Sequence, residues 1–227
     1  ESFKNSLIDC NFNTPFFENK LIEKLELKPL LDSYKSLINS VLYFGNTNTL
    51  LNKKSPNFSN FDDIELLISN HLENREFNLR FKPVGGKWRT IKGAKNSGFY
   101  LKYENSKYTT LYVVEGAKDG INTHLITGYD VFAIDSKNSI PNLLTEIMKN
   151  NKYKRIVILN DKDDLSPYDN YKNKINNFKN VYFWSWNKLD SDFNNLPNNA
   201  DITDVLKRLF ETKSLRDVKR GVNKFIK

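Results

Sequence analysis

The sequence predicts an α/β fold in which a sheet of parallel strands carries flanking helices, preceded by a helical segment and a small β subdomain. Short apolar runs rich in Val and Ile recur in the second half of the chain and alternate with helical patterns. Two of these runs end in acidic stretches, Leu111–Gly116 and Ile156–Asp164. Apolar runs of this kind are typical of buried parallel strands.

Residues 1–75 are predicted to form a helical N-terminal region. Leu21, Ile22 and Leu25, and then a second set from Leu30 to Leu42, recur at helical spacing, and Pro29 separates them. Phe61–Leu72 is expected to be a further amphipathic helix, since its apolar residues fit one helical face.

Residues 76–110 are predicted to form a small basic β subdomain. Phe77–Phe81 and part of Trp88–Ile91 alternate between apolar and polar residues, and Gly85-Gly86 between them favours a hairpin. Gly98–Tyr103 is expected to be another strand.

Residues 111–227 are predicted to form the main domain, in a repeating strand–helix order with right-handed crossovers. Strands are expected at 111–114, 131–134, 155–159 and 181–184. Helices are expected at 118–127, 140–150 and 167–178, and a last one near Thr203 capped by Asp201 or Thr203.

Carboxylates follow two of the expected strands and form a candidate catalytic and metal site. Glu115 ends the first strand, and Asp161 and Asp163 follow the third. Parallel sheets bind ligands at the carboxyl ends of their strands, and oxygen ligands favour Mg²⁺. A solvated loop glutamate and an Asp/Asn-rich turn are the alternative interpretations.

Three further acids have a structural explanation as well as a functional one. Asp119 would lie in the first turn of the helix after Glu115, where the helix dipole favours an acid. Helix capping accounts for Asp201 and Asp204 equally well.

The chain carries a formal net charge of +8 and a pI of about 9.3, which suits a polyanionic partner or reflects codon bias toward Lys and Asn. Lys87, Arg89, Lys92 and Lys95 are candidate contacts to nucleic-acid phosphates or a nucleotide, with a solvated basic strand face as the alternative. No apolar stretch approaches the roughly 18 residues of a membrane span.

Cys10 is the single cysteine, which fits a cytoplasmic location. The chain begins at Glu1 and its single methionine is Met148, so we expect a fragment of a longer protein.

Residues 111–210 resemble the Toprim domain of the primase type. The resemblance is carried by Val113-Val114-Glu115-Gly116 with Asp119, by Asp161-Lys162-Asp163, and by Asn199–Leu206. Gly86–Ala94, followed by Gly98–Leu101, also resembles the stretch that precedes this domain in phage and plasmid primases. Two departures are Asp164-Leu165-Ser166-Pro167 after the second motif, and the lack of a zinc-binding module in this sequence.

The resemblance implies RNA primer synthesis on single-stranded DNA from nucleoside triphosphates, with Mg²⁺ or Mn²⁺ held by Glu115, Asp161, Asp163 and Asp119. It places Asp201 and Asp204 close to the site, allows a replicative helicase as a further partner, and suggests a mobile genetic element as the source. Two alternatives remain open: a Toprim-type nuclease using the same acids, and a degenerate module that binds nucleic acid or loads a helicase.

Overall fold

The chain folds into two compact units. A computed structural model of residues 1–227 describes residues 15–46, 63–70, 77–83, 89–90, 98–103, 106–134, 136–149, 152–162, 178–186, 189 and 193–226. The first unit comprises Glu1–Leu21 and Leu31–Asn96, and the second comprises Ile22–Leu30 and Ser97–Lys227. The domain boundaries at 75/76 and 110/111 that the sequence suggested stay predictions.

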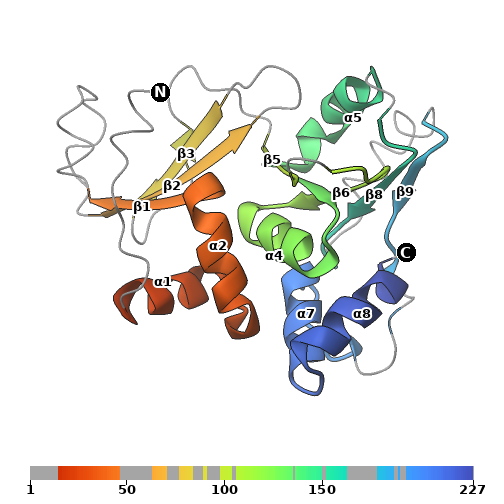
Figure 1. The fold of residues 1–227 in the computed structure, drawn as a ribbon. Helices are drawn as coiled ribbons and strands as arrows, with labels where there is room; N and C mark the ends of the chain where they lie inside the picture. Colours follow the sequence, from red (N-terminus) through yellow and green to blue (C-terminus); the bar gives the residue numbers. More distant parts are fainter. Residues whose placement is uncertain are drawn as a thin grey trace. The chain divides into compact units, whose positions relative to one another are not determined.

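The first unit combines a helix with an antiparallel sheet (Figure 1). Its elements are α2 (Leu31–Val41), β1 (Leu42–Asn46), β2 (Asp63–Asn70), β3 (Phe77–Pro83) and β4 (Arg89–Thr90). Both β1 and β3 pair with β2, and β3 pairs with β4, all antiparallel. The pairing of β3 with β4 agrees with the predicted hairpin, although its turn lies outside the described residues.

The helix predicted over Phe61–Leu72 is wrong, because residues 63–70 form β2. The apolar residues Ile64, Leu67 and Ile68 satisfy a helical period, but Ile64 and Ile68 also fit a period of two, and a short apolar segment does not distinguish the two. Pairing with segments distant in sequence decides the outcome, since Leu66 lies opposite Phe81 of β3.

The second unit is an α/β domain with a mixed sheet of mostly parallel strands, as the sequence predicted. Its strands are β5 (Phe99–Leu101), β6 (Thr110–Glu115), β7 (Asp130–Ile134), β8 (Arg155–Leu159) and β9 (Val181–Phe183). Its helices are η2 (Lys28–Leu30), α4 (Ala117–Thr127), η4 (Lys137–Ser139), α5 (Ile140–Lys149), α7 (Ile202–Phe210) and α8 (Leu215–Phe225). Helix α1 (Pro15–Leu25) has residues in both units. The four strands expected after residue 110 are all present. The helix expected at 167–178 lies almost entirely outside the described residues.

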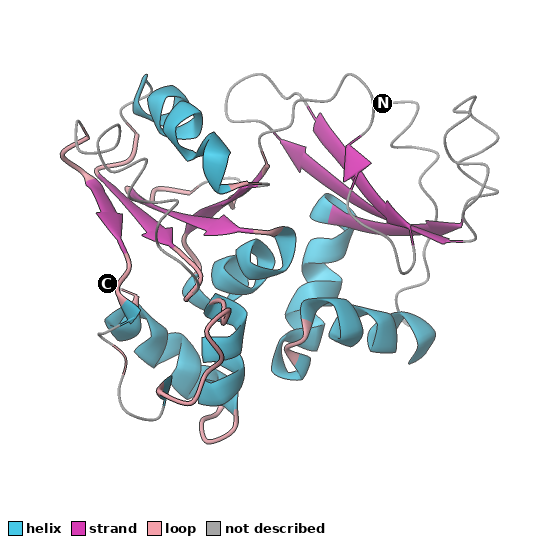
Figure 2. Cartoon of the chain, turned by 180° about the vertical axis from the view of Figure 1, so that it is seen from behind, coloured by secondary structure: helices cyan, strands magenta, loops and turns pink. Residues whose placement is uncertain are grey.

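The strand order in this unit is β5-β7-β6-β8-β9. β6 pairs in parallel with both β7 and β8, and β8 with β9, whereas β5 runs antiparallel to β7. β5 therefore joins this sheet through its pairing with β7. Helix α5 covers one face of the sheet, and α4, α7 and α8 lie on the other (Figures 1 and 2).

The next two strands after β6 in the chain therefore lie on opposite sides of it, β7 on one side and β8 on the other. This reversal makes β6 the centre of a topological switch, where open α/β sheets form a crevice at the carboxyl ends of their strands. The edge where β6, β7 and β8 end is called the carboxyl edge below, and the edge where they begin is called the amino edge.

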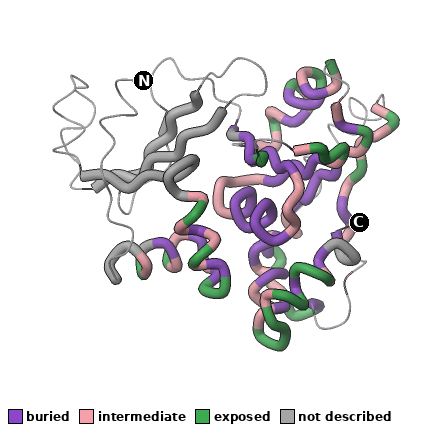
Figure 3. Tube along the Cα trace, viewed as in Figure 1, coloured by how far each residue is buried: buried purple, intermediate pink, exposed green. Residues whose placement is uncertain are grey.

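Burial in this unit is concentrated in the central strands and in α4 (Figure 3). Val113, Phe132 and Ile158 of the three central parallel strands are each no more than 1% exposed. Gly120 brings α4 close to the sheet, since a Cβ atom at this position would lie 2.6 Å from Cβ of Ala133. This close contact fixes the height of α4 above the sheet.

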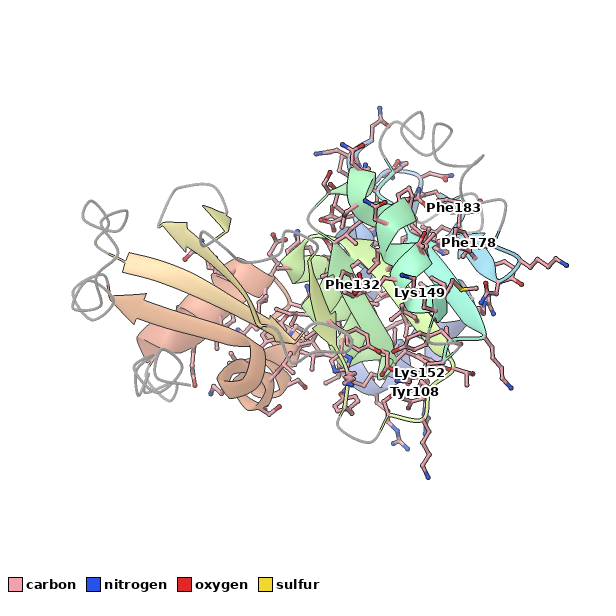
Figure 4. All side chains as sticks on the ribbon, turned by 90° about the horizontal axis from the view of Figure 1, so that it is seen from above. Tyr108, Phe132, Lys149, Lys152, Phe178 and Phe183 are labelled. Atoms are coloured by element: carbon pink, nitrogen blue, oxygen red, sulfur yellow. The ribbon has the colours of Figure 1, made fainter. Side chains whose placement is uncertain are left out.

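A buried carboxylate lies at the amino edge. Oδ2 of Asp130 accepts hydrogen bonds from Nζ of Lys152 (2.7 Å), from the hydroxyl of Tyr153 (2.8 Å) and from the hydroxyl of Tyr100 (3.2 Å). At this edge Lys154 N–H donates to the carbonyl of Thr109, and Lys152 is labelled in Figure 4. Asp130, Tyr100, Tyr153 and Lys152 are called the Asp130 cluster below.

His124 of α4 is buried near the same edge. Its Nδ1 donates a hydrogen bond to the carbonyl of Tyr129 at 2.7 Å, and the centroid of its ring lies 4.5 Å from the centroid of the Tyr103 ring. Burial lowers the pKa of His124, against the opposing effects of the Tyr129 carbonyl and the Asp130 charge.

Candidate metal and nucleotide site

Glu115 is the last residue of β6, at the carboxyl edge. The residues before it, 111–114, are buried, whereas the Glu115 side chain is 31% exposed. Gly116 follows with a φ of 87°, a conformation that favours glycine, and its N–H donates to the carbonyl of Ile134. The turn therefore starts α4 immediately and leaves the Glu115 carboxylate at the strand end.

Asp161 lies at the same edge, two residues after the end of β8. Three hydrogen bonds hold this segment: Trp186 Nε1 donates to the carbonyl of Asn160 (2.9 Å), Lys162 N–H to that of Ala200 (2.8 Å), and Lys162 Nζ to that of Leu196 (2.8 Å). The Asp161 side chain is 25% exposed. The strand end is thus fixed while its carboxylate stays accessible.

A lysine that was not predicted from the sequence lies between these two acids. Nζ of Lys137 is 3.5 Å from Oε2 of Glu115 and 3.9 Å from Oδ2 of Asp161, and its side chain is 14% exposed. Lys137 opens η4, which follows β7 and whose N-cap, Ser136, accepts a hydrogen bond from the N–H of Asn138. One residue from each of three consecutive strand ends therefore contributes to the site.

Sequence reasoning missed Lys137 because it searched the carboxyl edge for acids alone. Lys137 lies three residues beyond the end of β7, so the same strand-end rule that selects Glu115 and Asp161 also selects it. The distinguishing signal is its position and not its residue type, since lysine is abundant throughout the chain.

The donor set suits a hard divalent cation. Oε2 of Glu115 is buried and has no hydrogen-bond donor among the described residues, although the Lys137 ammonium is its ion-pair partner. Carboxylate oxygens are the ligands that Mg²⁺ and Mn²⁺ prefer. Within the described residues, no three acidic, histidine or cysteine side chains come together closely enough to hold a metal. Asp163, a further member of the predicted ligand set, lies outside those residues.

Asp119 is directed toward α7. Its Oδ1 accepts hydrogen bonds from the backbone N–H (3.2 Å) and the hydroxyl (2.5 Å) of Thr203, and the residue is 6% exposed. Burial and then the nearby Asp201 carboxylate raise its pKa well above the usual range. Asp119 joins α4 to α7, and its role as a metal ligand stays a prediction.

Asp201 and Asp204 form a capping box at the start of α7, as the sequence allowed. The Asp201 side chain accepts from the Asp204 N–H at 2.9 Å, and the Asp204 side chain accepts from the Asp201 N–H at 3.2 Å. Lys118 forms an ion pair with Asp201 at 2.9 Å. Capping therefore accounts for both residues, and their proximity to the site also stays a prediction.

The predicted phosphate contacts lie in the first unit. Lys87, Lys92 and Lys95 fall outside the described residues, and Arg89 begins β4. None of the helices in the described part of the chain has the length and hydropathy needed to cross a bilayer.

Comparison with known proteins gave structural similarities only. No family model matches the chain, and no curated protein matches it. The primase fragment of the bacteriophage T7 primase-helicase is similar, with 11% identity and a TM-score of 0.45; the match covers 65% of this chain and 62% of that one.

Two further structures are also similar. The Aquifex aeolicus primase (zinc-binding and RNA polymerase domains) has 16% identity and a TM-score of 0.48, with coverage of 98% of this chain and 54% of that one. A T7 lagging-strand DNA polymerase structure containing primase domains has 9% identity and a TM-score of 0.45, with 72% and 77% covered. The chain spans only part of these proteins, and all three TM-scores are below 0.5.

Proposed function

We propose that this chain is the catalytic part of a primase-like nucleotidyltransferase that joins ribonucleotides on single-stranded DNA with Mg²⁺ or Mn²⁺. The observation that carries the proposal is the convergence of Glu115 and Asp161 on one cation, the Lys137 ammonium, at the switch point of a parallel sheet. The Toprim-like motifs around Glu115, Asp161 and Asp163 support the same interpretation.

In this proposal Glu115, Asp161 and Asp163 hold the metal, which would neutralise the charge that develops on the triphosphate during transfer. Glu115 has a fixed position at a strand end, and the hydrogen bonds around Asn160 and Lys162 keep the second strand end in place. The nucleic acid would be bound by Lys87, Arg89, Lys92 and Lys95 through its phosphates.

A second candidate is a nucleic-acid-binding or helicase-loading module without catalysis. The observation that favours it is Lys137, whose ammonium already lies between the two carboxylates. In such a module the lysine would balance the two acids permanently, and no divalent cation would be needed.

The test is incubation of the protein with labelled ribonucleotides, single-stranded DNA and Mg²⁺ or Mn²⁺, scored for elongation and for degradation. Elongation that is lost in the Asp161→Asn variant supports the primase proposal. Degradation of the DNA would instead identify a nuclease, and DNA binding without either product would identify the module. Calorimetric titration with Mn²⁺ reports in parallel whether Asp161→Asn weakens metal binding.

A further inference from the structure

We propose that Lys137 is a phosphate-binding residue of this site, and that a divalent cation must displace its ammonium from the two carboxylates. The inference rests on the proposed function, because it requires a substrate that carries phosphate groups. Lys137 belongs to none of the motifs described above and was not predicted as a site residue.

The ammonium of Lys137 lies between the two carboxylates. Lys137 Nζ lies 3.5 Å from a Glu115 oxygen and 3.9 Å from an Asp161 oxygen, and both distances exceed the 2.7–2.9 Å of a charge-assisted hydrogen bond. The ammonium is thus a shared counter-ion to both acids. Because Oε2 of Glu115 is buried, leaving that carboxylate without a cation would be unfavourable.

A divalent cation would compete with the Lys137 ammonium for the carboxylate oxygens of Glu115 and Asp161. A divalent cation binds carboxylate oxygens at roughly 2.0–2.6 Å, depending on the ion. The ammonium would then lie within a few ångströms of a doubly charged ion, and like charges repel strongly at such distances in a partly buried site. Metal and ammonium therefore cannot both hold Glu115 and Asp161.

A displaced Lys137 ammonium would stay at the carboxyl edge. The turn that carries Lys137 has a defined local conformation, since Ser139 N–H and its hydroxyl both donate to the carbonyl of Ser136. Displacement therefore moves the side chain alone and leaves its positive charge at the carboxyl edge. Lysine commonly binds phosphate as a point charge, so a phosphate held at this edge is its natural new partner.

The experiment compares wild type with Lys137→Met, which keeps the length of the side chain and removes its charge. Lys149→Met is the matched control, because Lys149 is an exposed lysine at the far end of α5, the helix that follows η4 (Figure 4). Thermal melting checks that each variant folds. If Lys137→Met does not melt cooperatively, Lys137→Gln replaces it in both binding measurements.

The first measurement is Mn²⁺ affinity, followed by the electron paramagnetic resonance of free Mn²⁺. Removing the competing ammonium should tighten Mn²⁺ binding by about tenfold, while Lys149→Met should match wild type. Where Lys137→Gln has to be used, the same tightening is expected. Unchanged or weaker Mn²⁺ binding would overturn the displacement.

The second measurement is affinity for inorganic triphosphate at saturating Mn²⁺. Lys137→Met should weaken it by about tenfold, and Lys137→Arg, which restores a cation, should recover most of the loss. Equal triphosphate affinity in wild type and Lys137→Met would refute the inference, even if Asp161→Asn still abolishes primer synthesis. A wild-type protein that binds no Mn²⁺ would instead refute the proposed function, so the two failures are distinguishable.

Discussion

Lysine–carboxylate contacts occur at both edges of the same sheet, and they are built differently. At the amino edge, Asp130 is fully buried and one of its oxygens accepts three hydrogen bonds of 2.7–3.2 Å. At the carboxyl edge, Glu115 and Asp161 are a quarter to a third exposed, and Lys137 approaches them only to 3.5 and 3.9 Å.

The order of burial is also reversed between the two edges. Lys152 is 36% exposed while its acid is buried, whereas Lys137 is 14% exposed and its acids are more open. A carboxylate that is buried with several donors serves mainly to hold structure, and one that is open to solvent can exchange its cation. The comparison teaches that the geometry around a carboxylate, more than its presence, separates a structural acid from a candidate ligand.

The largest effect is expected from Glu115→Gln, on activity alone. If the metal site is catalytic, removing this charge should lower turnover by roughly 100- to 1,000-fold, as when a group acting on transition-state charge is lost. Little packing changes, because the side chain is partly exposed. Primer synthesis and thermal melting check this expectation, and near wild-type turnover with normal melting would remove Glu115 from the chemistry.

Asp130→Asn is expected to show the opposite pattern. It removes the charge to which Lys152, Tyr153 and Tyr100 donate, so the free energy of unfolding should fall by about 3 kcal/mol. Activity per folded molecule should hardly change. Denaturant unfolding measures the loss, and a stability equal to wild type would show that the Asp130 cluster does not hold the amino edge.

The strand ends at both edges were predictable from sequence, because apolar runs report burial directly. The runs before Glu115 and Asp161 predicted β6 and β8 almost to the residue. Of the two caps that the sequence allowed for the last predicted helix, Asp201 and Thr203, Asp201 is the N-cap of α7. The pairing of β5 with β7 was not predictable, because it depends on partners distant in the chain. The position of Lys137 just after β7 was predictable by the strand-end rule, but its contact with two acids on other strands was not.

Acidification should weaken the amino edge through His124. Its folded-state pKa is lowered below the ordinary 6.5, so the unfolded chain binds the proton more readily. The stability contributed by neutral His124 is therefore complete above pH 6.5 and is lost as the pH falls below it, by at most about 1.4 kcal/mol per pH unit. Unfolding at pH 7.5 and 5.5 measures this loss.

The control for that measurement is His124→Gln, which keeps a donor for the Tyr129 carbonyl without titrating. The difference in stability between the two pH values should shrink in this variant. His71 is present in both proteins, so its own titration cancels in the comparison. An undiminished difference would assign the pH dependence to other groups.

A smaller effect than that of Asp130→Asn is expected from removing single hydroxyls of the Asp130 cluster. Tyr153→Phe should lower the free energy of unfolding by about 1.5 kcal/mol, since it deletes a hydrogen bond of 2.8 Å to a charged oxygen and the bond of 3.2 Å that the hydroxyl accepts from Lys152. Tyr100→Phe, with a bond of 3.2 Å, should lower it less. The reverse ranking in denaturant unfolding would show that these distances do not reflect the strengths of the two bonds.

The reversal of the chain around β6 has a consequence for the order in which the site is assembled during synthesis. The ribosome makes Glu115 first, then Lys137, and Asp161 last, in the order of β6, β7 and β8. Since N-terminal parts of a chain emerge and begin to fold first, we expect Glu115 to meet the lysine before the second acid arrives. The nascent chain would then never have to bring two bare negative charges together.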